Sequence, residues 1–317
     1  MKKYQNKKNK ATKTGFGEGV LAAAQTNENV VGIGVDITKS VSMDLFANAF
    51  PDRFISIGIA EQNAVGVAAG MALSGKIPVF ATYAVFSALR TTDFIRISIC
   101  YNNLHVIIGG AHAGISVGPD GASHQALEDI AVMRSLPRMT VLSPADATQA
   151  KILTEKAINE LNGPVYIRFG REAVPDFTTE DQQLEIGKGQ LLKTGNDLTI
   201  VATGHMVWEA LQAANALKEN GFAARVINLH TIKPVDKDIL IKAAKETGLI
   251  VTVEEHQVIG GLGSAVAEVL AENHPVKMKM IGMNDHFGES GNPRELMEKY
   301  GLTAKHIYNE TLKLLNK

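Results

Sequence analysis

The sequence contains a single cysteine, Cys100, among its 317 residues. One cysteine excludes an internal disulfide, and a reducing cytoplasm is the simplest compartment for such a chain. No apolar run approaches the ~18 residues that a membrane-spanning helix requires, so we expect no membrane association. The N-terminal segment MKKYQNKKNK lacks the apolar core of a signal peptide. We expect residues 1–10 to form a flexible, solvated basic arm.

An excess of charge of one sign is also absent. The 32 Lys and Arg residues are balanced by 33 Asp and Glu residues, which gives a formal net charge of -1, and this balance does not favour binding to nucleic acid. Hydrophobic residues make up 45% of the chain, which also contains 29 glycines, a composition typical of α/β proteins. A chain of this length can form about two ordinary domains, each with its own core.

Short β-branched segments alternate along the chain with longer segments of helical periodicity. This alternation predicts parallel strands joined by crossover helices, and therefore two α/β domains. The strand-like segments are VVGIGVD, FISIGI, IPVFATY, LHVIIGG, MTVLSPA and PVYIRFG, followed later by DLTIVATG, ARVINLH and GLIVTVEE. Helices are expected over 14–26 and 144–161 and over MVWEALQAANALKENG. The polar segment 177–189 has no apolar period, so we expect it to link domains over 11–176 and 190–317.

Glu61 lies between the strand-like SIGIA and the helix-like AVGVAAGMAL. The helix dipole alone favours a carboxylate in a first helical turn, so a structural role is open. An acid enclosed by apolar groups, however, has its ionised form disfavoured, which suits it to exchange a proton near neutral pH. Ligands of open α/β sheets collect at the carboxyl ends of strands, where we expect this residue. Glu61 is therefore a candidate catalytic acid.

A glycine-rich loop within residues 109–133 follows the strand-like LHVII and carries His112, Asp120 and His124. Their spacings of eight and four residues match no standard metal site, and we expect no metal ligands in this chain. Three such groups in one loop favour hydrogen bonding to a hydroxylated or phosphorylated small molecule. A purely structural role for any one of the histidines stays open.

Three aromatic residues, Phe80, Tyr83 and Phe86, follow one another at intervals of three. Aromatics at this spacing are usual in a core, but they also form a wall on which a flat heteroaromatic ring can stack. Ser40 and Arg171 come shortly after the strand-like VVGIGV and PVYI, where a hydroxyl and a guanidinium could hold phosphate. Arg171 could equally serve as a salt-bridge partner.

The segment GGLGSAVAEVLAE contains part of a dinucleotide-binding fingerprint. Several residues separate its glycines from the preceding strand, and no suitable acid follows about 20 residues later. We therefore expect these glycines to serve helix packing.

Taken together, GIAEQNAVGVAAG, GPDGASHQALEDIAVMRSLPRMTVLSPAD and GPVYIRFGR resemble the pyrimidine-binding domain of the thiamine-diphosphate-dependent transketolase family. TIKPVD, VTVEEH, GGLGSAV and FGESG resemble the C-terminal domain of that family. The resemblance covers nearly the whole chain from about residue 10, and the ordered combination of these motifs is specific. It implies a parallel-sheet pyrimidine-binding fold followed by a transketolase C-terminal-like domain.

The resemblance implies a role for each candidate residue. It matches Glu61 to the glutamate that hydrogen-bonds the aminopyrimidine ring of thiamine diphosphate, and His124 to a catalytic histidine. Phe80, Tyr83 and Phe86 match the pocket around the pyrimidine, and Asp36 matches an acid near the cofactor and the subunit contact. Asp120 and His124 match the pair that reads the hydroxyls of the donor sugar. The group matched to the sugar phosphate consists of His112, Arg171, Ser40 and Lys13.

The family binds diphosphate and a divalent metal through Gly-Asp-Gly followed some 25 to 30 residues later by asparagine, and this pair does not occur here. The resemblance implies the C-terminal subunit of a split transketolase, active only with an N-terminal subunit that holds the diphosphate and Mg²⁺ or Ca²⁺. An α2β2 assembly and ketol transfer between sugar phosphates follow from the same resemblance. The alternatives are a 1-deoxy-D-xylulose-5-phosphate synthase-like activity, a 2-oxo acid dehydrogenase beta-like subunit, and a non-catalytic scaffold subunit.

Two departures from the family pattern affect substrate binding. The loop reads GPDGASH, where full-length transketolases have an acid before the aspartate and proline-threonine before the histidine. Lys13 stands where the family often has arginine, which binds phosphate through two parallel hydrogen bonds.

Overall fold

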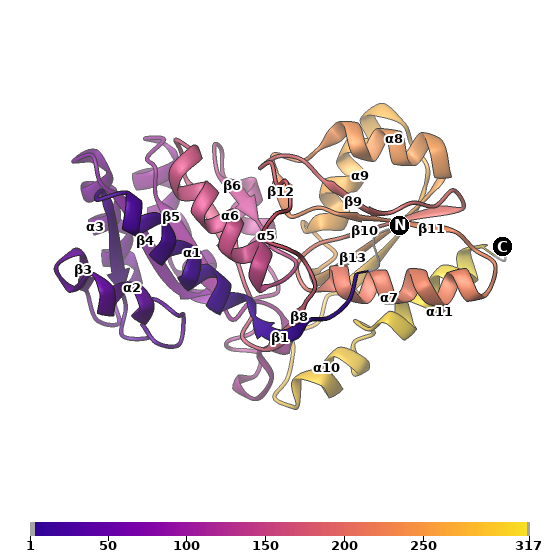
Figure 1. Cartoon of the computed structure of the whole chain (residues 1–317), viewed down its shortest axis with the longest axis horizontal. Helices are drawn as coiled ribbons and strands as arrows, with labels where there is room; N and C mark the ends of the chain where they lie inside the picture. The colour runs from indigo at the N-terminus through magenta and orange to yellow at the C-terminus, as the bar shows by residue number, and fades with distance from the viewer. Residues whose placement is uncertain (1–3, 316–317) are drawn as a thin grey trace.

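A computed structural model describes residues 4–315 as two α/β domains that pack against each other (Figure 1). This confirms the expected fold class. Within these residues, none of the helices combines the length and apolar character needed to cross a membrane.

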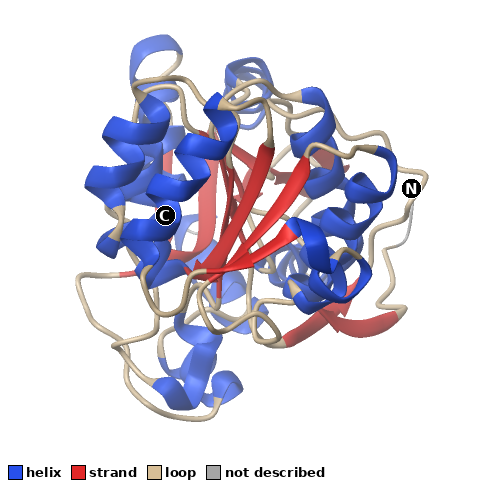
Figure 2. Ribbon diagram, turned by 90° about the vertical axis from the view of Figure 1, so that its left-hand side faces the viewer, coloured by secondary structure: helices blue, strands red, loops and turns tan. Residues whose placement is uncertain are grey.

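The first domain is built on a seven-stranded sheet in the order β12-β6-β7-β5-β4-β2-β3. Six of its strands are parallel to one another: β2 (Val30–Gly34), β3 (Phe54–Ser56), β4 (Ile77–Tyr83), β5 (Ile107–Ala111), β6 (Thr140–Leu142) and β7 (Val165–Arg168). All six were predicted from the alternation of β-branched and helical segments. Helices cover both faces of this sheet (Figure 2), as expected for parallel strands that are apolar along their whole length.

The helices of the first domain are α1 (Thr12–Thr26), α2 (Asp44–Ala49), α3 (Glu61–Leu73), α4 (Thr92–Phe94), α5 (Asp129–Ser135) and α6 (Ala147–Glu160). Short turns of other helix types span Pro51–Arg53 (η1), Phe86–Arg90 (η2), Ile95–Cys100 (η3) and Ile115–Asp120 (η4). Helices α1 and α6 pack closely on one face of the sheet. Gly15 permits this approach, since a side chain there would overlap the backbone of Ala147. Helix α3 packs on the opposite face through small residues such as Ala64 and Ala68.

The second domain has a five-stranded sheet in the order β14-β13-β10-β11-β9. Its strands are β9 (Gln190–Lys193), β10 (Leu198–Ala202), β11 (Ala224–Asn228), β13 (Leu249–Gln257) and β14 (Lys277–Met283), and only β9 runs antiparallel to its neighbour. Its helices are α7 (Met206–Glu219), α8 (Lys237–Thr247), α9 (Leu262–Asn273), α10 (Pro293–Lys299) and α11 (Ala304–Leu315).

The expected flexible arm is not what the structure shows for residues 4–10. Strand β1 (Lys8–Ala11) pairs antiparallel with β8 (Ala173–Asp176), and Lys7 Nζ donates to the carbonyl of Thr178. The Tyr4 ring packs edge-on against Phe177 with centroids 5.8 Å apart. Residues 4–10 are thus tied to the rest of the chain, with Lys10 ion-paired to Glu18 at 2.6 Å, while residues 1–3 of the expected arm lie outside the described residues.

The two domains also share a strand that the sequence pattern did not reveal. Strand β12 (Thr231–Lys233) comes from within the second domain but pairs antiparallel with β6 at the edge of the first sheet (Figure 1). No helix or strand interrupts the expected linker over 177–189. The connection between the domains is therefore double, and the second domain is fixed to the first sheet.

Candidate functional site

Glu61 is the first residue of α3, directly after the turn that follows β3. Its side chain is only 4% exposed, and Oε2 accepts a hydrogen bond of 2.9 Å from Nη1 of Arg90. The expected apolar enclosure is therefore incomplete, because the carboxylate pairs with the guanidinium of Arg90, whose side chain is 40% exposed. The sequence interpretation overlooked Arg90, although it stands at i+4 from Phe86 and so can reach the same side of a helical turn.

The ends of β4 and β5 bring an aromatic cluster together next to Arg90. Tyr83 stacks on His112 with ring centroids 4.3 Å apart and planes inclined by 17°. His124 meets the edges of Tyr83 and Phe86 at centroid distances of 5.8 and 5.5 Å. The Arg90 guanidinium carbon lies 4.1 Å from the centre of the Phe86 ring. Contacts thus run without a break from the Glu61 carboxylate to His112.

Polar groups lie near the hydroxyl end of Tyr83. Its hydroxyl is 2.9 Å from Oγ of Ser40, whose carbonyl accepts from Lys13 Nζ at 3.1 Å. Nη1 of Arg171 donates to the carbonyl of Val117 at 2.9 Å and contacts Asp120 Oδ1 at 3.3 Å. Four residues that are far apart in the sequence therefore come together at the loop that follows β5: Lys13, Ser40, Asp120 and Arg171.

His112 is buried and follows β5 with a left-handed φ of 53°, a conformation that costs energy in a residue other than glycine. Burial, reinforced by the charges of Lys13 and Arg171, lowers the pKa of His112 to about 4. Both ring nitrogens are buried and make no hydrogen bond of standard geometry within residues 4–315, although the nearby backbone of Ser40 partly opposes the fall in the pKa. A neutral imidazole with two free nitrogens can both donate to and accept from a small molecule. Burial, followed by the charge of Arg171, also lowers the pKa of Lys13.

The structure separates Phe80 from this cluster. Phe80 is fully buried between the sheet and α3, whereas Tyr83 contacts the core on the opposite face. Successive side chains of a strand alternate between faces, so residues three apart in β4 point to opposite sides. The spacing of three was interpreted as helical, but it spans a strand and the turn after it. Asp36 is exposed just after β2, with a left-handed φ of 69°.

The second domain holds the loop that carries Asp120 and His124. Glu255 Oε1 accepts the backbone N–H of Ser116 at 2.6 Å, and the buried Gln125 amide donates to the carbonyls of Ile115 and Glu289. Ile115 and Leu127 are part of the hydrophobic core of the second domain. A side chain at Gly114 would overlap the Glu255 carboxyl. The loop is therefore clamped at both ends.

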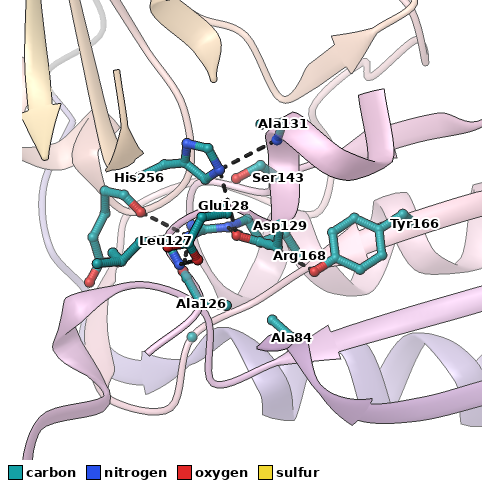
Figure 3. Close-up of polar contacts among 12 residues, drawn as sticks. Ala84, Ala126, Leu127, Glu128, Asp129, Ala131, Ser143, Tyr166, Arg168 and His256 are labelled. Atoms are coloured by element: carbon teal, nitrogen blue, oxygen red, sulfur yellow. Dashed lines mark hydrogen bonds and ion pairs between the residues drawn. The ribbon is translucent and has the colours of Figure 1, made fainter. Parts of the chain in front are cut away.

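Behind this loop lies a buried polar network between the domains (Figure 3). Asp129 Oδ2 accepts from Arg168 Nε at 2.9 Å and from the Tyr166 hydroxyl at 2.8 Å, and His256 Nε2 lies 3.9 Å from Asp129 Oδ1. Burial alone would lower the pKa of Arg168, but Asp129 and Glu255 outweigh it and the pKa is raised. Burial raises the pKa of Tyr166 well above its ordinary value and lowers that of His256 to about 4. The Asp129 carboxylate therefore faces the Arg168 cation and the neutral Tyr166 donor, whereas His256 Nε2 accepts the backbone N–H of Ala131 at 3.4 Å.

The glycines of the fingerprint-like segment serve the packing of α9. Glu254 accepts the backbone N–H groups of Leu262 at 2.6 Å and of Gly263 at 2.8 Å. The anion position at this helix N-terminus is thus filled by a carboxylate of the same domain. A side chain at Gly261 would overlap that carboxylate, which explains the glycine without a nucleotide. Within residues 4–315, no group of three His, Cys, Asp or Glu side chains is placed to hold a metal ion.

Comparison with known proteins places this architecture in a family. Residues 8–176 match the pyrimidine-binding domain of transketolase, and residues 187–307 match the transketolase C-terminal domain. A Methanocaldococcus jannaschii protein named as a transketolase C-terminal section is 44% identical over 311 residues, or 97% of each chain. One subunit of an apulose-4-phosphate transketolase from Phocaeicola vulgatus is 40% identical over 97% of this chain and 98% of its own length.

One relative of another activity and one solved structure complete the comparison. The 1-deoxy-D-xylulose-5-phosphate synthase of Heliobacterium modesticaldum is 39% identical over 92% of this chain, which covers 45% of that enzyme. A solved split-gene transketolase, described as an inactive beta4 tetramer, superposes with a TM-score of 0.90 and is 49% identical, with 96% of this chain and 98% of that chain covered. The chain belongs to the transketolase family, as a protein similar to the C-terminal part of split transketolases.

Proposed function

We propose that this chain is the C-terminal subunit of a split transketolase, which moves a two-carbon ketol unit from a ketose phosphate to an aldose phosphate with thiamine diphosphate. The observation that carries the proposal is the run of contacts from the buried Glu61 carboxylate through Arg90 to a ring cluster formed by Phe86, His124, Tyr83 and His112. This run ends beside two cationic side chains, Lys13 and Arg171. Such an arrangement offers a proton-sharing acid, a surface for ring stacking and an anion site in one place.

The residues fit the pyrimidine half of the cofactor. A buried carboxylate at a helix start can hydrogen-bond a ring nitrogen, and the Phe86 and Tyr83 rings provide faces for a planar heterocycle. When bound, thiamine diphosphate supplies the carbon nucleophile and the electron sink for the transferred fragment. Glu61 would share a proton with the ring, while the protein excludes water and orients the reactants. Phe80 has no part in this pocket because it lies in the core, and Asp36 remains a proposed contact near the cofactor and the partner.

The loop between the domains fits a phosphorylated sugar. Asp120 and His124 can bind hydroxyl groups, and His124 Nδ1 already lies 2.9 Å from the Ser123 hydroxyl. His112 stays neutral over the physiological range, so its unpartnered nitrogens can hydrogen-bond a substrate oxygen. Lys13, Arg171 and the Ser40 hydroxyl would hold the phosphate. We assign His124 a catalytic role next to the reacting carbons.

We further infer an N-terminal partner subunit that holds the diphosphate and a divalent metal, Mg²⁺ or Ca²⁺, in an α2β2 assembly in the cytoplasm. The similarity to a C-terminal section and to a split-gene transketolase supports this inference. Neither nucleic acid nor a membrane is proposed as a partner. The partner would complete the cofactor site, since this chain would supply only the pyrimidine side.

The strongest alternative is a 1-deoxy-D-xylulose-5-phosphate synthase-like activity, because such an enzyme is 39% identical over 92% of this chain. The test is to co-purify the chain with its partner, add thiamine diphosphate and Mg²⁺, and offer two substrate pairs. Consumption of xylulose 5-phosphate with ribose 5-phosphate supports ketol transfer, whereas consumption of pyruvate with glyceraldehyde 3-phosphate supports the alternative. Consumption of pyruvate alone would indicate a 2-oxo acid dehydrogenase beta-like subunit, and no cofactor-dependent turnover would indicate a scaffold.

A further inference from the structure

Arg90 makes two contacts that together describe a binding site. One nitrogen of its guanidinium donates to Glu61 Oε2 at 2.9 Å, and its carbon lies 4.1 Å from the centre of the Phe86 ring. A guanidinium is planar, carries N–H donors on its edge and stacks on aromatic faces. One of its nitrogens is thus engaged by the carboxylate while its carbon lies over the ring.

An aminopyrimidine offers the same features, namely a flat face and an edge of nitrogen atoms. Under the proposed function, on which this inference rests, the pyrimidine would need the Glu61 carboxylate for its edge and the aromatic wall for its face. Arg90 already holds both partners. The two planar groups therefore compete for one position.

We propose that the Arg90 guanidinium occupies the position of the aminopyrimidine in the cofactor-free chain. It pairs with the Glu61 carboxylate until the cofactor binds, and then moves away from it. The burial of the two partners supports a movement of the arginine side chain alone. The Glu61 side chain is 4% exposed at a helix start, while that of Arg90 is 40% exposed and can turn into solvent.

The backbone beside Arg90 is anchored, so departure of the guanidinium does not require the turn to unfold. Arg90 is the last residue of the π-helical turn η2, and its neighbours Ser87 and Thr91 are fully buried. The Thr91 hydroxyl donates to the carbonyl of Ser87 at 2.7 Å. Helical turns of this type recur at functional sites.

Pairing with Arg90 stabilises Glu61 in the cofactor-free chain. A buried carboxylate without a partner is destabilising, because no water or cation compensates for its lost hydration. With Arg90 in place, Glu61 can be held at the start of α3 before any cofactor arrives. Competition also has a measurable consequence, since the apparent affinity for the pyrimidine falls by the fraction of chains in which Arg90 is away from Glu61.

The test measures binding of 4-amino-5-hydroxymethyl-2-methylpyrimidine, the pyrimidine half of the cofactor, to the full chain by NMR titration. We expect Arg90→Ala to bind this probe about 5- to 10-fold more tightly than the wild type, because the competitor is gone. Arg96→Ala is the matched control on the neighbouring turn η3, where the exposed Arg96 lines a separate pocket with Tyr101 and Arg138, and it should bind like the wild type. Arg90→Lys, which keeps the charge but lacks the planar group, should fall between the two.

Thermal unfolding provides a second readout that is independent of catalysis. Arg90→Ala should unfold at a lower temperature than the wild type, because Glu61 loses its cation, and a saturating probe should raise its midpoint more than that of the wild type. Equal or weaker probe binding by Arg90→Ala would overturn the proposal and leave the proposed function standing, with Arg90 then a fixed support of Glu61. Absence of binding to the wild type and to every Arg90 variant would also overturn the proposal, while the proposed function would still be decided by ketol transfer in the complex with the partner.

Discussion

Replacing Arg168 by methionine should be among the most destabilising single changes outside the hydrophobic cores. The Arg168 side chain is 6% exposed, and Nε donates to both carboxylate oxygens of Asp129 at 3.2 and 2.9 Å. Its Nη2 donates to the carbonyls of Ala126 and Glu255, at 3.3 and 2.8 Å. The guanidinium therefore joins β7, the start of α5 and β13 of the second domain.

The magnitude follows from what the substitution leaves behind. In Arg168→Met, Asp129 keeps the Tyr166 hydroxyl, while Nε2 of His256, 3.9 Å away, accepts the backbone N–H of Ala131 and so offers Asp129 no proton. Removing one partner of a buried ion pair costs about 3–5 kcal/mol, because the remaining charge stays buried and uncompensated. Asp129→Asn should cost a similar amount for the same reason. The double variant should be more stable than the sum of the two changes predicts, because neither charge is then left alone.

Urea denaturation measures this coupling. Far-UV circular dichroism follows both domains, while fluorescence of Trp208, the only tryptophan, follows α7 in the second domain. Because Arg168 bonds to Glu255, we expect Arg168→Met to lower the midpoint seen by both probes. A loss below about 1 kcal/mol for Arg168→Met, or costs of the two single changes that simply add, would refute the reasoning.

Two further predictions concern Gly114 in the loop and the buried histidines His112 and His230. Gly114→Ala should destabilise the protein by about 3 kcal/mol or more, since residue 114 has φ of 88° and an added Cβ would overlap Glu255; Gly66→Ala in α3, where a Cβ meets no atom within 4 Å, is the control and should be neutral or stabilising in the same urea titration. Burial lowers the pKa values of His112 and His230 to about 4, so the unfolded chain binds these protons at higher pH than the folded chain. Stability should therefore be fully present above pH 6.5 and fall towards pH 4, by about 3 kcal/mol for each histidine; His230→Gln should reduce this slope, and an equally steep profile in that variant would contradict the assignment.

Sequence patterns predicted the fold well for helices and strands whose residue periodicity is visible within a single segment. The six parallel strands of the first sheet and helices α1, α6 and α7 coincide with runs of β-branched or helical period. Strand β12 has only three residues, and its pairing with β6 is a contact between distant segments that no periodicity records. The pairing of β1 with β8 was overlooked for the same reason, because a basic run is solvated equally well in an arm and in an exposed strand.

The residues of the candidate site were likewise predicted only in part. The resemblance to the transketolase family supplied its candidate residues, and most of them lie in one connected group. Phe80 was misassigned because a spacing of three has opposite meanings in a helix and in a strand. Arg90 and Glu255 were overlooked because their importance comes from the side chains they meet, Glu61 and the backbone of Ser116, which are 29 and 139 residues away in the chain.

The central claim is that Glu61 acts on the cofactor, and its replacement by glutamine tests this most directly. Glutamine keeps the shape of the side chain but cannot share a proton with the pyrimidine, and loss of such a group typically costs about 100- to 10,000-fold in rate. The measurement is thiamine-diphosphate-dependent ketol transfer by the complex with the partner subunit, with Glu28→Gln, an exposed acid before β2, as the matched control. The account predicts that Glu61→Gln assembles normally and loses at least about 100-fold of the rate, while Glu28→Gln keeps it. Turnover by Glu61→Gln close to that of the wild type would contradict the account.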